Sequence, residues 1–228
     1  ACRAGFVELK DGRFLAIGAQ SDELFSIVSA DRGRTWSVPS RVRDQSGIAI
    51  QGRRIGSVIR LASGALAICY EFVFGAGALG ETLALGFRRS DDEGGTWTEE
   101  TPIGLPGDRG SPYHDAMEQT STGRLLLPVR STFSNPTQRT PAMATVDGRE
   151  YDVEGHAHYP ELDISYVYYS DDEGQTWSRS EGDLFVWLDD GYRGAYACDE
   201  PTLAESKDGR LVMFMRSTVG RIVEAWSA

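Results

Sequence analysis

The sequence has few cysteines, few histidines and no long apolar run, and each shortage excludes a class of protein. Its 228 residues include three cysteines, Cys2, Cys69 and Cys198, which follow no regular spacing. An odd and irregular set of cysteines fits neither a disulfide framework nor a zinc site. No apolar stretch reaches the length that a membrane-spanning helix needs. We therefore expect no metal, no cofactor and no membrane insertion.

Positive charge is also scarce. The chain has 23 lysines and arginines against 34 acidic residues, a net charge of −11. This balance disfavours nucleic acid and anionic membrane surfaces as partners. An anionic ligand would therefore need a local cluster of arginines. The compartment stays open, with a secreted or periplasmic location favoured over a cytoplasmic one because a leader could have been removed before Ala1.

Glycine is plentiful, and many of the 26 glycines fall in repeated turns. The pattern S-x-D-x-G-x-T-W occurs three times, at residues 29–36, 90–97 and 170–177. In such a turn the aspartate accepts hydrogen bonds from nearby backbone, and the glycine adopts a positive φ. The tryptophan then supplies a large apolar anchor between neighbouring sheets. The pattern predicts a structural turn rather than a catalytic site.

A second repeat is a turn that ends in glycine between two apolar runs, centred on Gly12, Gly64, Gly123 and Gly209. D-G and S-G turns between apolar runs are typical of β-hairpins. A third alternating strand, such as residues 165–169, then leads into the eight-residue turn and a fourth strand. Four antiparallel strands in each unit predict an all-β propeller blade. The third unit is the longest, and its excess between residues 131 and 161 predicts a long loop.

The eight-residue turn resembles the Asp-box, or BNR repeat, of sialidases and other β-propellers. This resemblance implies that residues 1–228 form a single sialidase-like propeller domain, of a kind with six blades when complete. The sequence stops at Ser227-Ala228, two residues into what matches a fourth box. We therefore expect about four blades, with the last blades missing. A complete four-bladed propeller is the alternative.

Charged residues stand at matching positions at the ends of the otherwise apolar strands. Nine or ten residues before the turn glycines are Arg3, Arg54, His114 and Glu200, and seven residues after them are Ala19, Glu71, Arg130 and Arg216. Equal register predicts that these groups converge on one end of the central channel. Because unpaired buried charge is costly, they either hold a polar ligand or close the channel as a ring of salt bridges.

Two segments extend the resemblance to sialidases. The run Arg54-Ile55-Gly56 is similar to the R-I-P segment of that family, with glycine in place of proline. The run from Glu200-Pro201 to Met215-Arg216 resembles the segment that carries a glutamate and a second arginine. The resemblance implies that Arg54 and Arg216 bind a substrate carboxylate and that Glu200 activates a tyrosine nucleophile.

The same end of the channel supplies four more candidate substrate-binding residues: Arg130, His114, Asp115 and Glu71. Sialidases place the nucleophilic tyrosine and a third arginine in their last blades, which this chain lacks. The aspartate that acts as acid and base in sialidases lies on the loop after the second strand of the blade that carries the first arginine. The corresponding loop of this chain, residues 72–81, contains no aspartate. The sequence thus predicts a sialidase-like exo-glycoside hydrolase that acts on a terminal, acidic sugar of a glycan or oligosaccharide. A non-catalytic glycan-binding propeller and a polysaccharide lyase on the same scaffold are the alternatives.

Overall fold

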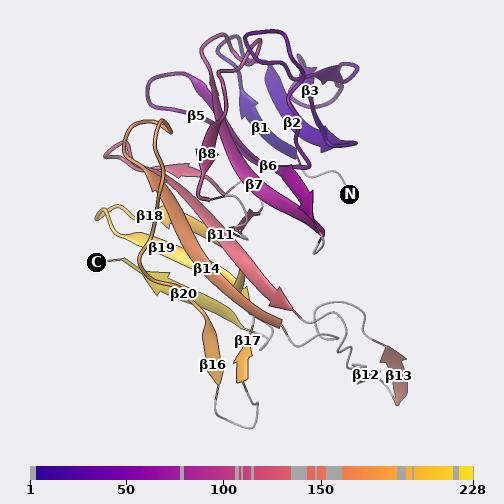
Figure 1. Cartoon of the computed structure of the whole chain (residues 1–228), viewed down its shortest axis with the longest axis vertical. Coiled ribbons are helices and arrows are strands. Elements are labelled where there is room, and N and C mark those ends of the chain that lie inside the picture. The colour runs from indigo at the N-terminus through magenta and orange to yellow at the C-terminus, as the bar shows by residue number, and fades with distance from the viewer. Residues whose placement is uncertain are drawn as a thin grey trace.

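The fold is a row of antiparallel sheets that follow one another along the chain, from indigo at the N-terminus to yellow at the C-terminus (Figure 1). It is seen in a computed structural model that describes residues 4–77, 80–105, 108, 110–113, 116–134, 143–146, 148–152, 161–188, 194–196, 198–217 and 221–227. Four sheets correspond to the four predicted units, so the propeller blades expected from the repeats are confirmed.

Each of the first two sheets has four strands in chain order. The first contains β1 (Ala4–Glu8), β2 (Phe14–Gln20), β3 (Glu23–Ser29) and β4 (Ser40–Arg41). The second contains β5 (Arg54–Arg60), β6 (Leu66–Gly77), β7 (Gly80–Ser90) and β8 (Thr101–Ile103).

The third and fourth sheets depart from this plan. In the third sheet two short strands pair with the same long one, in the set β9 (Ser111–Pro112), β10 (Glu118–Gln119), β11 (Leu125–Ser134), β14 (Glu161–Ser170) and β15 (Ser178–Arg179). The fourth has three described strands, β18 (Cys198–Glu205), β19 (Leu211–Ser217) and β20 (Ile222–Trp226).

Two small hairpins lie outside the four sheets. The first falls in the long segment predicted between residues 131 and 161 and pairs β12 (Met143–Val146) with β13 (Arg149–Asp152). The second pairs β16 (Val186–Leu188) with β17 (Gly194–Tyr196), just before the fourth sheet. Neither hairpin was predicted from the repeats, because both lie in insertions that the repeats do not share.

The turn glycines behave as their positions predict. Gly12, Gly64, Gly123 and Gly209 have φ angles between 81° and 93°, a backbone region that glycine enters without steric penalty. These turns join β1 to β2, β5 to β6, β10 to β11 and β18 to β19, and each fixes the cross-strand register of its pair.

The three Asp-boxes share one hydrogen-bond pattern. In the second box the Asp92 carboxylate accepts the Thr96 N–H at 2.8 Å and the Thr96 hydroxyl at 2.8 Å, and the Ser90 hydroxyl accepts the Gly94 N–H at 2.8 Å. The same contacts recur in the first and third boxes. In every box the residue before the glycine also has a positive φ, which the sequence pattern did not reveal because this residue is arginine or glutamate.

The apolar core lies between consecutive sheets. One cluster joins the first and second sheets, another the second and third, and another the third and fourth. Two box tryptophans enter these layers. Trp97 is fully buried against the first sheet, and Trp177 packs edge-on against Phe87 of the second, with ring centroids 5.3 Å apart. The predicted anchoring role of the tryptophan is therefore seen in the second and third boxes.

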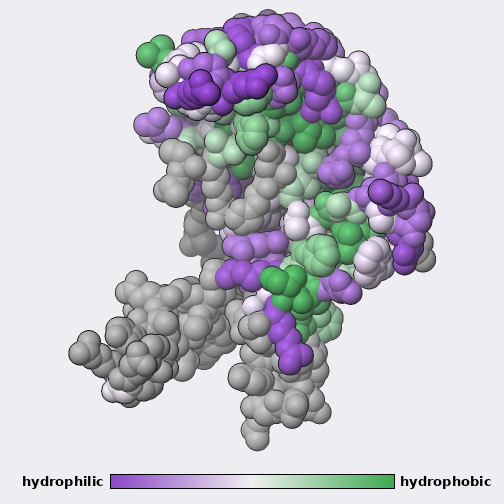
Figure 2. Space-filling view, turned by 180° about the vertical axis from the view of Figure 1, so that it is seen from behind, coloured by the Kyte–Doolittle hydropathy of each residue, from purple (hydrophilic) through white to green (hydrophobic). Residues whose placement is uncertain are grey.

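The outer surface is mixed in character. Seen from behind, hydrophilic side chains gather over the loops of the first sheet at the top, and apolar side chains show between polar ones lower down (Figure 2). Within the described part of the chain, no helix has the length and apolar character needed to cross a membrane.

Candidate functional site

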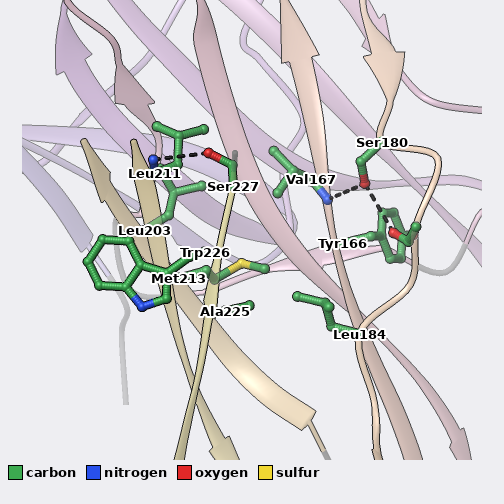
Figure 3. Close-up of a pocket in the computed structure, with 11 residues that line it drawn as sticks. Tyr166, Val167, Ser180, Leu184, Leu203, Leu211, Met213, Ala225, Trp226 and Ser227 are labelled. Atoms are coloured by element: carbon green, nitrogen blue, oxygen red, sulfur yellow. Dashed lines mark hydrogen bonds between the residues drawn. The ribbon is translucent and has the colours of Figure 1, made fainter. Parts of the chain in front are cut away.

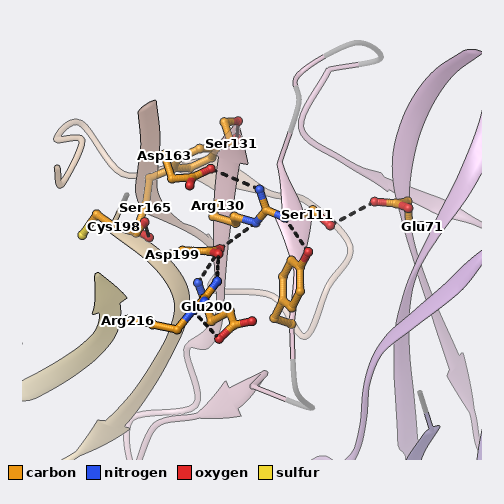
Figure 4. A network of polar contacts seen from close by, with 12 residues as sticks. Glu71, Ser111, Arg130, Ser131, Asp163, Ser165, Cys198, Asp199, Glu200 and Arg216 are labelled. Atoms are coloured by element: carbon orange, nitrogen blue, oxygen red, sulfur yellow. Dashed lines mark hydrogen bonds and ion pairs between the residues drawn. The ribbon is translucent and has the colours of Figure 1, made fainter. Parts of the chain in front are cut away.

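The candidate site lies where the second, third and fourth sheets bring the ends of their first hairpins together. Three cross-strand pairs mark this end: Arg54 with Glu71, Ser111 with Arg130, and Asp199 with Arg216. Figure 4 shows most of these side chains in one polar network between the sheets. We call the following residues the inner cluster: Arg54, Glu71, Ser111, Tyr113, Arg130, Asp163, Asp199, Glu200 and Arg216.

The Arg54 corner is built around a buried glutamate. Arg54 donates from Nη1 to the Ser111 hydroxyl at 2.9 Å, and that hydroxyl donates to Glu71 Oε2 at 3.1 Å. Arg54 Nη2 lies 4.0 Å from Glu71 Oε1. The Glu71 side chain is only 3% exposed, so its charge depends on this arginine and hydroxyl for compensation.

The glycine that replaces the proline of the sialidase segment has a packing reason. Gly56 lies at a register shift between Ile55 and Ser57 in β5. A Cβ atom at Gly56 would lie 2.6 Å from Pro112 Cγ and 2.8 Å from Cys69 Sγ, closer than carbon atoms approach in real structures. Glycine therefore lets β9 approach β5, which places Ser111 within reach of Arg54.

Tyr113 lies between two arginines and links the corners of the inner cluster. The guanidinium carbons of Arg54 and Arg130 lie 5.6 Å and 4.8 Å from the centre of its ring. Arg130 also donates from Nη2 to the Tyr113 hydroxyl. The ring thus offers its negative face to cations and separates two like charges that would otherwise repel.

The segment that carries Ser111 and Tyr113 is tied to the third sheet by Asp108. The hydroxyls of Tyr166 and Tyr168, both on β14, donate to the Asp108 carboxylate, the first at 3.2 Å. Gly110 fits close by, because a Cβ there would lie 2.8 Å from the Tyr166 hydroxyl. These contacts fix the direction from which the segment enters the site.

Arg130 is the buried centre of the inner cluster. Its Nη1 lies 3.1 Å from Asp163 Oδ1 and its Nε lies 2.7 Å from Asp199 Oδ1. Burial alone would lower the pKa of Arg130, but the Tyr113 hydroxyl and the charges of Asp199 and Asp163 together raise it. All three guanidinium nitrogens face protein partners, which fits an organising role better than direct contact with a ligand.

Arg216 is held from one side by two consecutive acids. Asp199 Oδ2 accepts a hydrogen bond from Arg216 Nη2 at 2.7 Å, and Glu200 Oε2 lies 2.9 Å from Arg216 Nε. The Nε contacts of Arg130 and Arg216 are ion pairs rather than directed hydrogen bonds. Burial lowers the pKa of Arg216, but the hydrogen bond to Asp199 and both carboxylate charges raise it above its ordinary value.

The members of the inner cluster fall into a buried and an accessible group. The side chains of Asp163, Asp199 and Glu71 are at most 3% exposed, and that of Arg130 is 13% exposed. The side chains of Arg54, Arg216 and Glu200 are 33%, 38% and 28% exposed. The most exposed charged residues are therefore the two arginines that the resemblance implies for a substrate carboxylate and the glutamate that it implies for activating a nucleophile.

The sequence predicted some of these residues and missed others. Arg54, Glu71, Arg130, Glu200 and Arg216 are brought together, whereas Arg3, His114 and Asp115 lie outside the described residues. Ser111, Tyr113, Asp163 and Asp199 were missed. A strict spacing of ten residues before the turn glycine selects Arg54, Tyr113 and Asp199, so a stricter register would have found two of the four. Asp163 carries no such spacing signal.

A separate groove of about 400 Å³ opens between the third and fourth sheets (Figure 3). Apolar side chains form most of its wall, among them Val167, Leu203 and Met213. Val167 holds the same place before its Asp-box as Phe87, which receives Trp177, holds in the second sheet. No charged side chain lines the groove among the described residues, so it is not the candidate site.

Comparison with known proteins fits this architecture. The sequence profile of the BNR repeat-like domain matches residues 79–228, more than half of the chain. The chain belongs to this family. No curated protein matches the sequence.

Solved structures with the same fold are glycoside hydrolases of several specificities. Penicillium chrysogenum α-L-arabinanase, complexed with arabinobiose, is 14% identical with a TM-score of 0.59; the match covers 99% of this chain and 62% of that one. Trypanosoma rangeli sialidase in complex with sialic acid is 16% identical with a TM-score of 0.54; the match covers 100% of this chain and 36% of the sialidase chain. A family 117 glycoside hydrolase of Zobellia galactanivorans is 14% identical with a TM-score of 0.55; the match covers 100% of this chain and 66% of the hydrolase chain.

This chain therefore spans between about a third and two thirds of the length of these three neighbours. At such identities the likeness shows the propeller fold of the BNR repeat-like family, and the chemistry must be argued from the site.

Proposed function

We propose that this BNR repeat-like propeller is part of an exo-acting glycoside hydrolase that removes a terminal acidic sugar from a glycan. The observation that carries the proposal is the division of the inner cluster into accessible and buried groups. Two guanidiniums and one carboxylate, from Arg54, Arg216 and Glu200, are the most exposed charged groups of the inner cluster. A guanidinium binds a planar carboxylate through two parallel hydrogen bonds, which suits the acid group of a sugar.

The accessible carboxylate suits proton transfer. In the proposed reaction Glu200 accepts the proton of a hydroxyl nucleophile as that oxygen bonds to the anomeric carbon and the glycosidic bond breaks. A separate acid protonates the departing oxygen. Glu71 and Arg130 support the arginine side of the site, and His114 and Asp115 are proposed further sugar ligands on the strength of their sequence positions.

A neutral sugar is the second candidate, because the inner cluster contains four carboxylates and three guanidiniums. This balance gives an anionic ligand less attraction than an arginine cluster alone would provide. A non-catalytic glycan-binding propeller uses the same contacts without Glu200 chemistry. Substrate choice and the Glu200 variant separate these possibilities.

The test is hydrolysis of 4-methylumbelliferyl sialoside, glucuronide and arabinofuranoside by the full-length protein and its Glu200→Gln variant. We expect turnover of one acidic glycoside, reduced about 10²–10⁴-fold in kcat by the substitution, since positioned proton transfer contributes that much. Arg54→Met should act mainly on KM. Turnover of the arabinofuranoside alone would favour the neutral sugar. Binding of sialic or glucuronic acid without any turnover would favour the binding propeller.

A further inference from the structure

One buried carboxylate, that of Asp199, contacts three other members of the inner cluster at once. Its Oδ1 lies 2.7 Å from Arg130 Nε and accepts the backbone N–H of Glu200 at 2.7 Å. Its Oδ2 accepts from Arg216 Nη2 at 2.7 Å. The residue is 1% exposed, so these contacts rather than water compensate its charge. Figure 4 shows Asp199 at the junction of both arginines.

The backbone next to Asp199 is irregular, and the Asp199 carboxylate accepts a hydrogen bond from it. The β18–β19 register shifts between Asp199 and Thr202, and Glu200 adopts a φ of 48°. Residues other than glycine rarely enter this left-handed region, and they persist there only when their surroundings hold them. The hydrogen bond from the Glu200 N–H to Asp199 is such a hold, and the bulge turns the Glu200 side chain toward Arg216 Nε.

Asp199 and Glu200 together determine which edge of Arg216 a ligand can meet. They engage Nη2 and Nε, which form one edge of the planar guanidinium. One hydrogen of Nη1 and the second hydrogen of Nη2 form another edge, which is the remaining fork for a bidentate carboxylate.

We propose that Asp199 is the positioning residue of the site, because it sets the orientation of Arg216 and the backbone conformation of Glu200 together. The inference rests on the proposed function only for the identity of the ligand. Asp199 acts through its neighbours and does not itself touch the substrate. The proposed role therefore predicts that the effects of Asp199 and Arg216 substitutions on ligand binding are coupled, which general destabilisation of the fold would not produce.

The binding test is a double-mutant cycle in the full-length protein, with N-acetylneuraminic acid and glucuronic acid as probes. Asp199→Asn should raise Kd at least tenfold in the otherwise unchanged protein and less than twofold in an Arg216→Met background. Asp163→Asn is the matched control, because it removes an equally buried charge beside Arg130 and leaves the Asp199 contacts in place. Its effect on Kd should differ less than twofold between the two backgrounds, because Asp163 acts on Arg216 only through its charge. Equal effects of Asp199→Asn in both backgrounds would overturn the proposal.

A second measurement needs no substitution and no ligand. The Glu200 amide, held by Asp199, should exchange with deuterium at least a hundredfold more slowly than an unprotected amide. Exchange at the unprotected rate would overturn the positioning role even if Asp199→Asn failed to fold. If neither sugar acid binds the unchanged protein, the acidic substrate is wrong, while the exchange rate still decides whether Asp199 holds Glu200.

Discussion

The outer and inner ends of the sheets are built on different principles. At the outer end three Asp-boxes repeat the same hydrogen bonds to within 0.2 Å, and their aspartates are partly or fully exposed. At the inner end the corresponding positions of successive sheets hold different residues, Arg54, Tyr113 and Asp199. Repetition therefore builds the scaffold, and the departure from repetition builds the site.

The two ends also differ in how much each charge matters. At the outer end, which we call the rim, water can solvate a charge whose partner is lost. A buried charge at the inner end has no such compensation. Arg124 and Arg130 make this comparison possible within one hairpin. Arg124 binds the rim residue Asp171 through two hydrogen bonds of 2.7 and 2.9 Å, and Arg130 joins Asp163 and Asp199 at the inner end.

The largest predicted effect is that of Arg130→Met. It removes the charge between two buried carboxylates, and we expect the free energy of unfolding to fall by about 3–5 kcal/mol. Arg124→Met, the control at the rim, should cost about 1 kcal/mol or less, since half-exposed pairs contribute little. Urea unfolding of both variants measures the difference. Equal losses would show that the inner cluster is no more sensitive to lost charge than the rim.

A smaller loss of stability is expected when either of two glycines is replaced by alanine. The two glycines have similar backbone angles but different surroundings. Gly174, in the third box, has a φ of 88°, and a Cβ there would lie 2.0 Å from Phe87 Cε1. Gly209, in a hairpin turn, has a φ of 81° and no atom within 4 Å of such a Cβ. Gly209→Ala should cost about 1–2 kcal/mol from the left-handed backbone alone.

Gly174→Ala should lower the free energy of unfolding by about 1–3 kcal/mol more than Gly209→Ala does, because the methyl group must also displace Phe87. Chemical denaturation of the two variants gives the difference directly. If Gly209→Ala proved the more damaging change, the close packing of the third box against the second sheet would not be what requires glycine.

The sheets of the molecule could be predicted from its sequence more fully than the site. Gly12, Gly64, Gly123 and Gly209 recur at a fixed distance from apolar strands, so the hairpins and sheets follow from local chemistry. The site depends on contacts between sheets that no repeat encodes. Asp163 comes from β14 and meets Arg130 only because β11 and β14 pair. Asp199 likewise meets Arg130 of another sheet, a contact that no spacing in the sequence reveals.

The smallest effect concerns the pH dependence of a contact between the first two sheets. Arg60, on β5, donates two hydrogen bonds of 2.8 Å to Glu93, which also accepts the Lys10 N–H. The Arg60 hydrogen bonds, chiefly, lower the pKa of Glu93 from 4.5 to about 2. Because the folded pKa lies below the unfolded one, Glu93 stabilises the fold above about pH 4.5, and this contribution is lost as the pH falls toward about 2.

The Glu93→Gln variant isolates that contribution. Its free energy of unfolding should be lower than that of the unchanged protein near neutral pH, and the two should converge as the pH falls from about 4.5 toward about 2. Added salt should narrow the gap at neutral pH, since Glu93 and Arg60 are partly exposed and their attraction is screened. A difference in the free energy of unfolding that stays constant across this range would show that the titration of Glu93 contributes little, so that its contacts at the rim stabilise the fold without a net electrostatic contribution from its charge.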